Sequence, residues 1–340
     1  MLGARSKRRV RVALALCAFG AGIAGCGGGG SSGGATSLRA VWNVQVKVHI
    51  DDIAVGEGGV WLATDGGVVR LDPSTGKIVA SIPVAGTAGA IATGPGSVWA
   101  AFLTQDKLSS FLVRIDPTQN RVVDQTQRFR SEALGIAVGA GGVWVTTDLN
   151  GGEINEFDPT TVRMVGSPIM LEPAGTLGAT HNVGGAAVLE GTTLWVSQGM
   201  SGSLTRVDTT SRSVVGSPVQ VDGENVGPVV PYGSAIWVGT DANNIVSGSG
   251  HVVQVQGGSV SKRVTVPGET TIQGLTSAFG EVWVLGLDGN GKLQALDPAS
   301  GQLTGLPTTF QAGQAVTVIS GLGALWVFTT DNQLYKLAAA

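Results

Sequence analysis

Charged residues are scarce in this chain. They make up 13% of its 340 residues, whereas hydrophobic residues make up 43%, and an ordinary soluble domain carries about 25% charged residues. Histidine and cysteine are scarcer still, with three and two copies, and no pair has the HExxH or CxxC spacing of a zinc site. From residue 38 onward the chain also lacks a GxSxG nucleophile elbow. The sequence therefore carries no signature of a zinc enzyme or of an α/β-hydrolase.

The first 25 residues have the composition of an export signal. Five basic residues between positions 5 and 11 precede an apolar run over positions 12–24, which is too short to cross about 30 Å of hydrocarbon. The run ends in IAGC, which resembles the lipobox of bacterial lipoproteins and implies that Cys26 is acylated and becomes the new amino terminus. Residues 26–37 would then be a Gly/Ser-rich tether. We expect an exported protein, lipid-anchored to the outer face of the cell membrane.

Removal of this signal changes the charge and the thiol content of the chain. It takes away five of the 21 basic residues and none of the 24 acidic ones, which leaves a net charge of −8. An acidic chain is a poor electrostatic partner for nucleic acid or for an anionic bilayer. Cys17 leaves with the signal, so an internal disulfide is excluded. We therefore expect no nucleic-acid partner, and membrane contact through the lipid anchor only.

One motif recurs seven times in the rest of the chain. In each copy a glycine turn and an aliphatic residue precede a tryptophan, at intervals of 38 to 51 residues. The seven tryptophans are Trp61, Trp99, Trp144, Trp195, Trp237, Trp283 and Trp326. Glycine stands three residues before the tryptophan in five copies and four residues before it in the other two, which we interpret as one inserted residue. A period of this length indicates a repeat architecture.

Each copy divides into four short β-patterned runs, which in the first copy are DIAVGEG, VWLAT, VVRLD and KIVASIPV. At the turn LDPSTGK we expect Asp72 to hydrogen-bond the turn backbone, Pro73 to fix φ and Gly76 to permit a positive φ. The last copy has three runs, and the strand-like segment at residues 40–50 fits as its outer strand. The sequence thus predicts an all-β, seven-bladed β-propeller over residues 38–340, with four antiparallel strands per blade and an amino-terminal strand closing the last blade.

Repeats of the form IAVGEGGVWLAT…VVRLDPSTGKIVASIPV resemble those of the YncE-like and virginiamycin B lyase-like propellers of bacterial envelopes. The resemblance covers residues 40–340 and implies the propeller fold. For the lyases it also implies catalysis by paired histidine and glutamate residues with a metal. The last three copies of the repeat hold one histidine, His251, and no histidine-x-glutamate pair. No catalytic residue is therefore transferred from that family.

Features present in every copy are explained by what every blade needs, so we assign the seven tryptophans and the glycine turns to packing. Ligand contacts are expected where the copies differ, in the loops entering the innermost strands around the channel mouth. Counting back from each tryptophan, by twelve residues or by thirteen in the two copies with the insertion, gives a ring of polar residues: His49, Thr87, Glu132, Asn182, Glu224, Thr271 and Gln314. Asp51, Asp52, His181 and Glu269 reinforce this ring. The same polarity would arise if these positions merely ended strands in solvent.

Two functions fit these features. The first is a non-enzymatic envelope lipoprotein, a monomeric binding or scaffold module for a protein partner or cell-wall component, without a cofactor. The alternative is a metal-dependent lyase or lactone hydrolase of the virginiamycin B lyase-like or gluconolactonase-like type, with Asp52, Glu132, His181 and Glu224 around a divalent ion such as Ca²⁺ or Mg²⁺. Assembly of outer-membrane proteins is a third role, which fits less well because the composition resembles that of Gram-positive lipoproteins. The missing catalytic motifs favour the first function.

Overall fold

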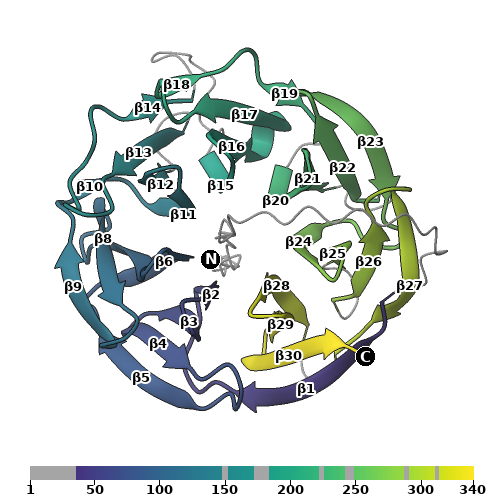
Figure 1. Ribbon diagram of the computed structural model, residues 1–340, viewed down its shortest axis with the longest axis horizontal. Helices are drawn as coiled ribbons and strands as arrows, with labels where there is room; N and C mark the ends of the chain where they lie inside the picture. Colours follow the sequence, from purple (N-terminus) through teal and green to yellow (C-terminus); the bar gives the residue numbers. More distant parts are fainter. Residues whose placement is uncertain are drawn as a thin grey trace, which may run out of the picture.

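The computed structural model describes residues 36–147, 152–171, 184–221, 226–241, 249–286, 291–310 and 314–340. In these ranges the chain forms seven antiparallel sheets, arranged in a ring around a central axis (Figure 1). In each sheet the first, second and third strands from the axis follow one another in the sequence; in the last blade the outermost strand is β1, from the start of the chain. The predicted seven-bladed β-propeller is confirmed. The signal, Cys26 and the tether up to residue 35 lie outside the described residues.

The blades use their first two strands in the same way. The innermost strands are β2 (Asp52–Gly56), β6 (Thr87–Gly94), β11 (Ala133–Gly139), β15 (Gly184–Glu190), β20 (Val226–Tyr232), β24 (Ile272–Ala278) and β28 (Ala315–Gly321). The second strands are β3 (Gly59–Thr64), β7 (Ser97–Leu103), β12 (Gly142–Thr147), β16 (Thr193–Gln198), β21 (Ala235–Thr240), β25 (Glu281–Gly286) and β29 (Ala324–Thr329).

The outer half of the blades is less regular. The third strands are β4 (Gly67–Leu71), β8 (Ser109–Asp116), β13 (Glu153–Phe157), β17 (Ser203–Asp208), β22 (His251–Gln256), β26 (Leu293–Asp297) and β30 (Gln333–Ala339). The outermost are β5 (Ile78–Pro83), β9 (Arg121–Gln125) with β10 (Phe129–Arg130), β14 (Ile169–Met170), β18 (Ser213–Val214) with β19 (Val219–Gln220), β23 (Ser259–Thr265), β27 (Gln302–Thr308) and β1 (Leu38–Gln45). Among the described residues, one 3₁₀ turn, Gly199–Ser201, follows β16.

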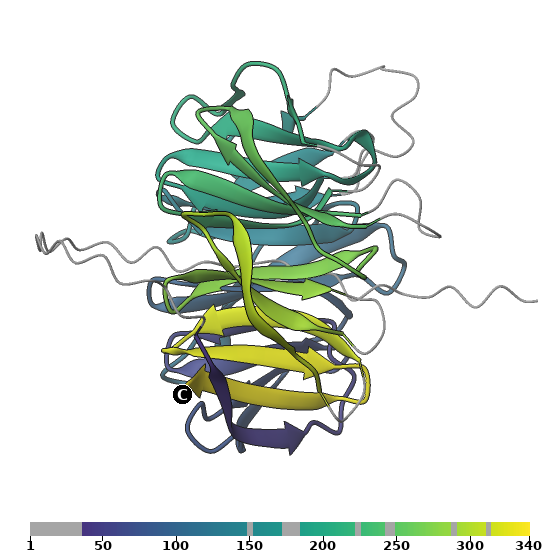
Figure 2. The same cartoon turned by 90° about the vertical axis from the view of Figure 1, so that its right-hand side faces the viewer.

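The two faces of the disc are built from different connections, because the strands of a blade run alternately in opposite directions. The mouth face is the one on which the inner strands begin, and it also carries the connections between second and third strands. The turn face carries the hairpins between first and second strands and the turns between third and fourth strands. Figure 2 shows the strands edge-on, running across the disc from one face to the other.

The amino-terminal strand closes the ring, as predicted, although it ends at Gln45 and not at residue 50. β1 pairs antiparallel with β30, with Leu38 opposite Ala339 (Figure 1). From β1, Trp42 packs on Trp326 with ring centroids 5.4 Å apart. Its ring also lies against Gly76 of the first blade, where a Cβ atom would come within 3.0 Å of it. The first and last blades are thus joined by backbone pairing and by aromatic packing.

The seven motif tryptophans are buried, with exposed fractions of 0 to 6%, so the predicted packing role is confirmed. The hydrogen bonds of their indole N–H groups also explain why this position holds tryptophan and not phenylalanine. Four of them donate the indole N–H to the carbonyl oxygen five residues earlier, at 3.0 to 3.3 Å: Trp61, Trp144, Trp283 and Trp326. This bond ties each second strand to the end of its inner strand, and the ring fills the space between blades.

The predicted one-residue insertion in two copies is wrong. All seven hairpins between first and second strands have two-residue turns, including Glu190 opposite Thr193 and Tyr232 opposite Ala235 in blades four and five. In those two blades glycine occupies the first turn position, as Gly191 (φ 59°), whereas elsewhere it occupies the second, as Gly58 (φ 68°). Both positions of tight hairpin turns accept a positive φ, so glycine moved while the turn length stayed constant.

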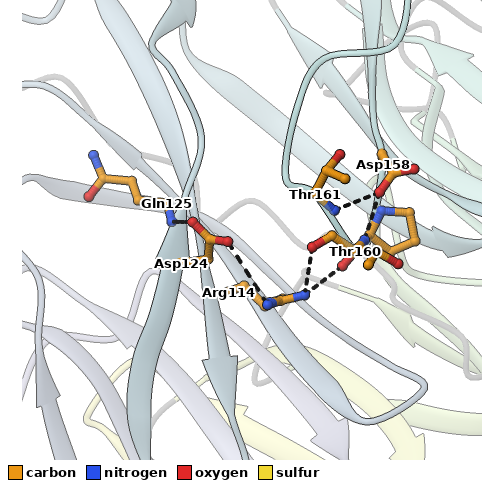
Figure 3. A network of polar contacts seen from close by, with 7 residues as sticks. Arg114, Asp124, Gln125, Asp158, Thr160 and Thr161 are labelled. Atoms are coloured by element: carbon orange, nitrogen blue, oxygen red, sulfur yellow. Dashed lines mark hydrogen bonds and ion pairs between the residues drawn. The ribbon is translucent and has the colours of Figure 1, made fainter.

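Cationic side chains of one blade hold the outer turns of the next on the turn face. Arg70 lies over the ring of Trp61, 4.8 Å from its centroid, and donates to the carbonyl oxygen of Pro117 at 2.5 Å. Arg114 donates in the same way to the carbonyls of Pro159 (2.8 Å) and Thr160 (3.3 Å) (Figure 3). These contacts form a clasp between neighbouring blades that repeats with the fold.

The clasp changes its chemistry around the ring. In the third blade the equivalent position, opposite Trp144, is Glu156, and Arg212 from the fourth blade donates to its Oε2 at 2.6 Å. In the last blade Lys336 lies 5.3 Å from the ring centroid of Trp326 and donates to the carbonyl of Pro73 at 2.7 Å. Between blades three and four the roles are exchanged. The third blade supplies the acceptor, Glu156, and the outer turn of the fourth blade supplies the cation, Arg212.

The aspartate turns have the predicted geometry. Asp72 Oδ1 accepts hydrogen bonds from the backbone N–H groups of Ser74 and Thr75, both at 2.9 Å, and Gly76 has a φ of 72°. The Ser74 hydroxyl and these N–H groups lower the pKa of Asp72 from 3.8 to about 2. Turn hydrogen bonds also lower the pKa of the equivalent aspartates, Asp116, Asp158, Asp208 and Asp297.

Candidate functional site

The described members of the predicted ring lie at the starts of the inner strands on the mouth face. Thr87 opens β6, and Glu132, Thr271 and Gln314 directly precede β11, β24 and β28. These four side chains are half-buried, and His49, in the connection from β1 to β2, is exposed. The inner strands lie side by side around the axis (Figure 1). The structure therefore brings these residues to one face, and their role in binding stays a prediction.

Asp52 joins the first two blades. Its side chain is 2% exposed. One carboxylate oxygen accepts the backbone N–H of Ile53, and the other accepts that of Ile91 in the neighbouring inner strand, both at 2.8 Å. At the equivalent position in blade six, a Cβ atom on Gly274 would lie 3.4 Å from the backbone nitrogen of Val318. Gly274 therefore leaves room for the next strand, whereas in the first blade Asp52 uses the same proximity to form a bridge.

His49 and Asp51 form a contact near the start of the same inner strand. Nε2 of His49 lies 3.5 Å from Oδ1 of Asp51, and the His49 side chain is 58% exposed, against 15% for Asp51. The backbone N–H of Asp51 donates to the carbonyl of Ala63 at 2.9 Å, which fixes the aspartate beside the second strand. The pair presents one exposed imidazole to solvent on the mouth face.

Glu269 is buried, with 2% of the residue exposed. Its carboxylate lies 3.3 Å from Nζ of Lys292, and it packs over Gly286, where any Cβ atom would clash with it at 2.4 Å. The ion pair joins the connection that enters the sixth blade to the one between that blade's second and third strands. Glu269 therefore supports the mouth face from inside and already has a cationic partner.

His181, Asn182 and Glu224 lie outside the described residues. The corrected turn length also changes which residues are equivalent to the ring in blades four and five. Counting back twelve residues from Trp195 and Trp237 gives Val183 and Asn225, in place of Asn182 and Glu224. By sequence register, the ring is therefore polar at six of its seven positions, not at all seven.

A polar cluster between the second and third blades was missed by sequence reasoning. Thr147 ends β12 opposite Glu153 at the start of β13, and Asn155 follows two residues later on the same face of that strand. The exposed fractions are 0% for Thr147, 6% for Glu153 and 1% for Asn155. Asn155 Nδ2 donates to Glu153 Oε1 at 3.0 Å. A comparison of the repeats could have revealed this cluster, because blades one and two have Val69 and Val113 where the third has Asn155.

A second polar cluster lies between the third and fourth blades. Gln198, at the end of β16, is 1% exposed, and its Oε1 accepts hydrogen bonds from the hydroxyls of Thr205 (2.6 Å) and Ser203 (3.1 Å). Its Nε2 is buried with no hydrogen-bond partner in the described parts of the chain. Both interfaces of the third blade thus contain buried polar side chains near the mouth face.

Within the ranges that the structure describes, no three histidine, cysteine, aspartate or glutamate side chains gather in a group that could hold a metal ion. In the same ranges, no helix has the length and apolarity needed to cross a bilayer.

No family model and no curated protein sequence matches this chain. Its fold is similar to that of solved propellers. The β-propeller domain of Cps50 (Swd1) from Myceliophteria thermophila is 10% identical, with a TM-score of 0.73 over 89% of this chain and 100% of that one. Hydrazine synthase of Kuenenia stuttgartiensis is 13% identical, with a TM-score of 0.69 over 87% and 98%. BamB from Moraxella catarrhalis is 14% identical, with a TM-score of 0.58 over 89% and 98%. At these identities the likeness shows the fold alone, and this fold hosts many functions.

Proposed function

We propose that this chain is an envelope-anchored β-propeller that acts as a binding or scaffold module, and that its mouth face engages a protein partner or a cell-wall component. The difference between the two faces carries the proposal. On the turn face all seven blades repeat one two-residue hairpin, and clasps hold the outer turns. On the mouth face the connections between second and third strands vary from residues 65–66 between β3 and β4 to residues 241–250 between β21 and β22. Variable loops on a rigid scaffold are where binding residues concentrate.

The point at which the chain enters the propeller supports this assignment. The backbone N–H of Thr36 donates to Oε1 of Glu281 at 3.4 Å, and the N–H of Ala340 donates to the carbonyl of Ser37 at 2.9 Å. Glu281 opens β25 directly after a turn-face hairpin, and Ala340 follows the end of β30 on that face. An anchor upstream of residue 36 would therefore join the propeller on its turn face, which is the side opposite the mouth face.

Blocking one face at a time tests the proposal. In a Cys26→Ser chain, Gln105→Cys places a thiol on the exposed mouth-face connection between β7 and β8, and Thr192→Cys places one on an exposed turn-face hairpin. Each is coupled to a polyethylene glycol maleimide and used to capture partners from detergent-solubilised envelopes. We expect the turn-face adduct to retain the partners of the unlabelled protein and the mouth-face adduct to lose them. Equal recovery by both adducts would remove the mouth face from the binding account.

The lipid anchor has a separate test. The IAGC sequence and the Gly/Ser-rich tether motivate the proposal that Cys26 is acylated. Cys26→Ser should then release the protein into the medium, because the mature chain loses its acyl chains. Detergent phase partitioning of the two proteins measures the change. If the variant stays in the membrane fraction, the attachment is of another kind, whatever the outcome of the capture experiment.

A further inference from the structure

The polar cluster of Thr147, Glu153 and Asn155 lies in an apolar interface. The face of the third blade that carries it also carries Val145 and Phe157, and these pack against Leu112 and Phe129 of the second blade in one buried cluster. Phe129 and Phe157 have ring centroids 5.4 Å apart. The three polar side chains are more than nine-tenths buried. Interactions among them therefore occur in a medium that screens charge far less than water does.

Within this interface two buried oxygens of the cluster, Asn155 Oδ1 and Thr147 Oγ1, have no hydrogen-bond partner among the described residues. In the described chain Glu153 has no ion pair, and Asn155 Nδ2 is the donor seen at its carboxylate. The amide must turn its nitrogen toward the carboxylate, because two acceptors would repel each other, so Oδ1 is the atom left over. A buried carboxylate without a cation and two unsatisfied polar atoms are each costly.

We propose that Thr147, Glu153 and Asn155 bind a hard metal cation between the second and third blades, beneath the mouth face. Carboxylate, amide carbonyl and hydroxyl oxygens are the ligands of Ca²⁺ and of the alkali cations, and no soft ligand is present. One ion would compensate the Glu153 charge and satisfy both leftover oxygens, with water completing its shell. Cross-strand pairing holds Thr147 and Glu153 within one side-chain contact of each other. This site shares no residue with the ring at the mouth and does not depend on the proposed function.

The test is cation binding by the mature, full-length Cys26→Ser chain after treatment with a chelator. Thermal unfolding is followed against CaCl₂, MgCl₂, NaCl and KCl at constant ionic strength with choline chloride, and ion retention is measured by equilibrium dialysis with elemental analysis. One cation should raise the Tm in proportion to the logarithm of its concentration above Kd, by about 5 °C at a hundredfold excess over its Kd. Comparing the titrations with the four salts shows whether the bound ion is divalent or monovalent. No Tm shift with any of the four salts and no retained ion would mean that water alone satisfies the cluster, and would overturn the proposal.

Matched variants locate the site. Glu153→Gln keeps the shape of the side chain and removes its charge, so it should abolish the cation-dependent shift. In cation-free buffer it should be at least as stable as the parent, which a merely structural role would not produce. Thr147→Val should weaken cation binding without abolishing it. Glu269→Gln is the control, because it alters a buried carboxylate that already pairs with Lys292, and it should keep the shift. Persistence of the shift in Glu153→Gln would place the ion elsewhere.

Discussion

The repeated tryptophans use their indole N–H groups as well as their bulk. Trp283 and Trp237 occupy the same position in neighbouring blades, with exposed fractions of 2% and 0%. Trp283 Nε1 donates to the carbonyl of Ala278 at 3.1 Å, whereas Trp237 Nε1 is buried without a partner in the described chain. The two positions therefore separate the contribution of the ring from that of its hydrogen bond.

Trp283→Phe should cost about 1 kcal/mol more of unfolding free energy than Trp237→Phe, because only the first change removes a buried hydrogen bond. Both variants lose the same ring volume, so each is the control for the other. Urea unfolding followed by circular dichroism measures the difference. Equal losses would show that the indole N–H does not contribute to blade stability.

The turn aspartates make stability depend on acid pH. Turn hydrogen bonds lower the pKa of Asp72 from 3.8 to about 2. A carboxylate whose pKa is depressed in the folded state stabilises that state above its ordinary pKa, and this contribution is lost as the pH falls through the folded value.

The urea concentration at the midpoint of unfolding should therefore decrease as the pH is lowered from 4 to 2. Over that window it should decrease less steeply for Asp72→Asn than for the unsubstituted chain. The neutral amide still accepts the turn N–H bonds but has no proton to take up. Asp65→Asn, at an exposed aspartate on the mouth face, controls for the loss of one negative charge. Parallel curves for the parent and Asp72→Asn would contradict the prediction.

At the scale of the elements, the turns keep their shape when their residues change. The aspartate turns require a positive φ at one position, which Gly76 and Gly301 supply in two copies. The same position holds Val162 (φ 58°) in the third blade and Arg212 (φ 54°) in the fourth. A β-branched residue in this region is strained, yet the Val162 side chain is 3% exposed and packs in the interface between blades. Arg212 combines the turn position with the ion pair to Glu156.

The Glu156–Arg212 ion pair should couple blades three and four. In a double-mutant cycle with Glu156→Gln and Arg212→Gln, we expect a coupling free energy of about 1 kcal/mol, since the side chains are 11% and 26% exposed and 2.6 Å apart. The Arg114–Asp124 pair, at 3.9 Å and with Asp124 42% exposed, is the matched comparison. Its coupling should lie near zero, as is common for exposed pairs. A coupling free energy of zero at Glu156–Arg212 would leave the clasp to packing and to the hydrogen bonds that Arg212 donates to the carbonyls of Val165 and Ser167.

At the scale of the whole molecule, a propeller must close its ring, because an open blade would expose its apolar face. Here the closure pairs the first strand with the last, over the register from Leu38 opposite Ala339 to Gln45 opposite Gln333. Trp42 extends that closure to the first blade through its contacts with Trp326 and Gly76. Lys336 adds a hydrogen bond to Pro73. Three kinds of contact thus meet where the two ends of the chain meet.

Trp42→Ala should destabilise the fold by about 2–3 kcal/mol, less than the 3–5 kcal/mol expected for a fully buried aromatic residue, because Trp42 is half-buried. Trp42→Phe should recover part of that loss, since it keeps an aromatic ring against Trp326. Limited proteolysis should also release residues upstream of β2 faster in the alanine variant. Unchanged stability in Trp42→Ala would mean that backbone pairing alone closes the ring.

The sequence determined the blade count, the burial of the seven tryptophans, the aspartate turns and the closing strand. It could do so because a period of 38 to 51 residues repeats the same local chemistry seven times. Turn length was misjudged because a hairpin accepts glycine at either turn position, and spacing to the tryptophan does not distinguish a moved glycine from an added residue. Tertiary structure alone decided what the remaining polar residues do. Asp52 bridges two blades, and Thr147 and Asn155 share one buried interface. Such contacts depend on how neighbouring sheets meet, which no spacing along the chain encodes.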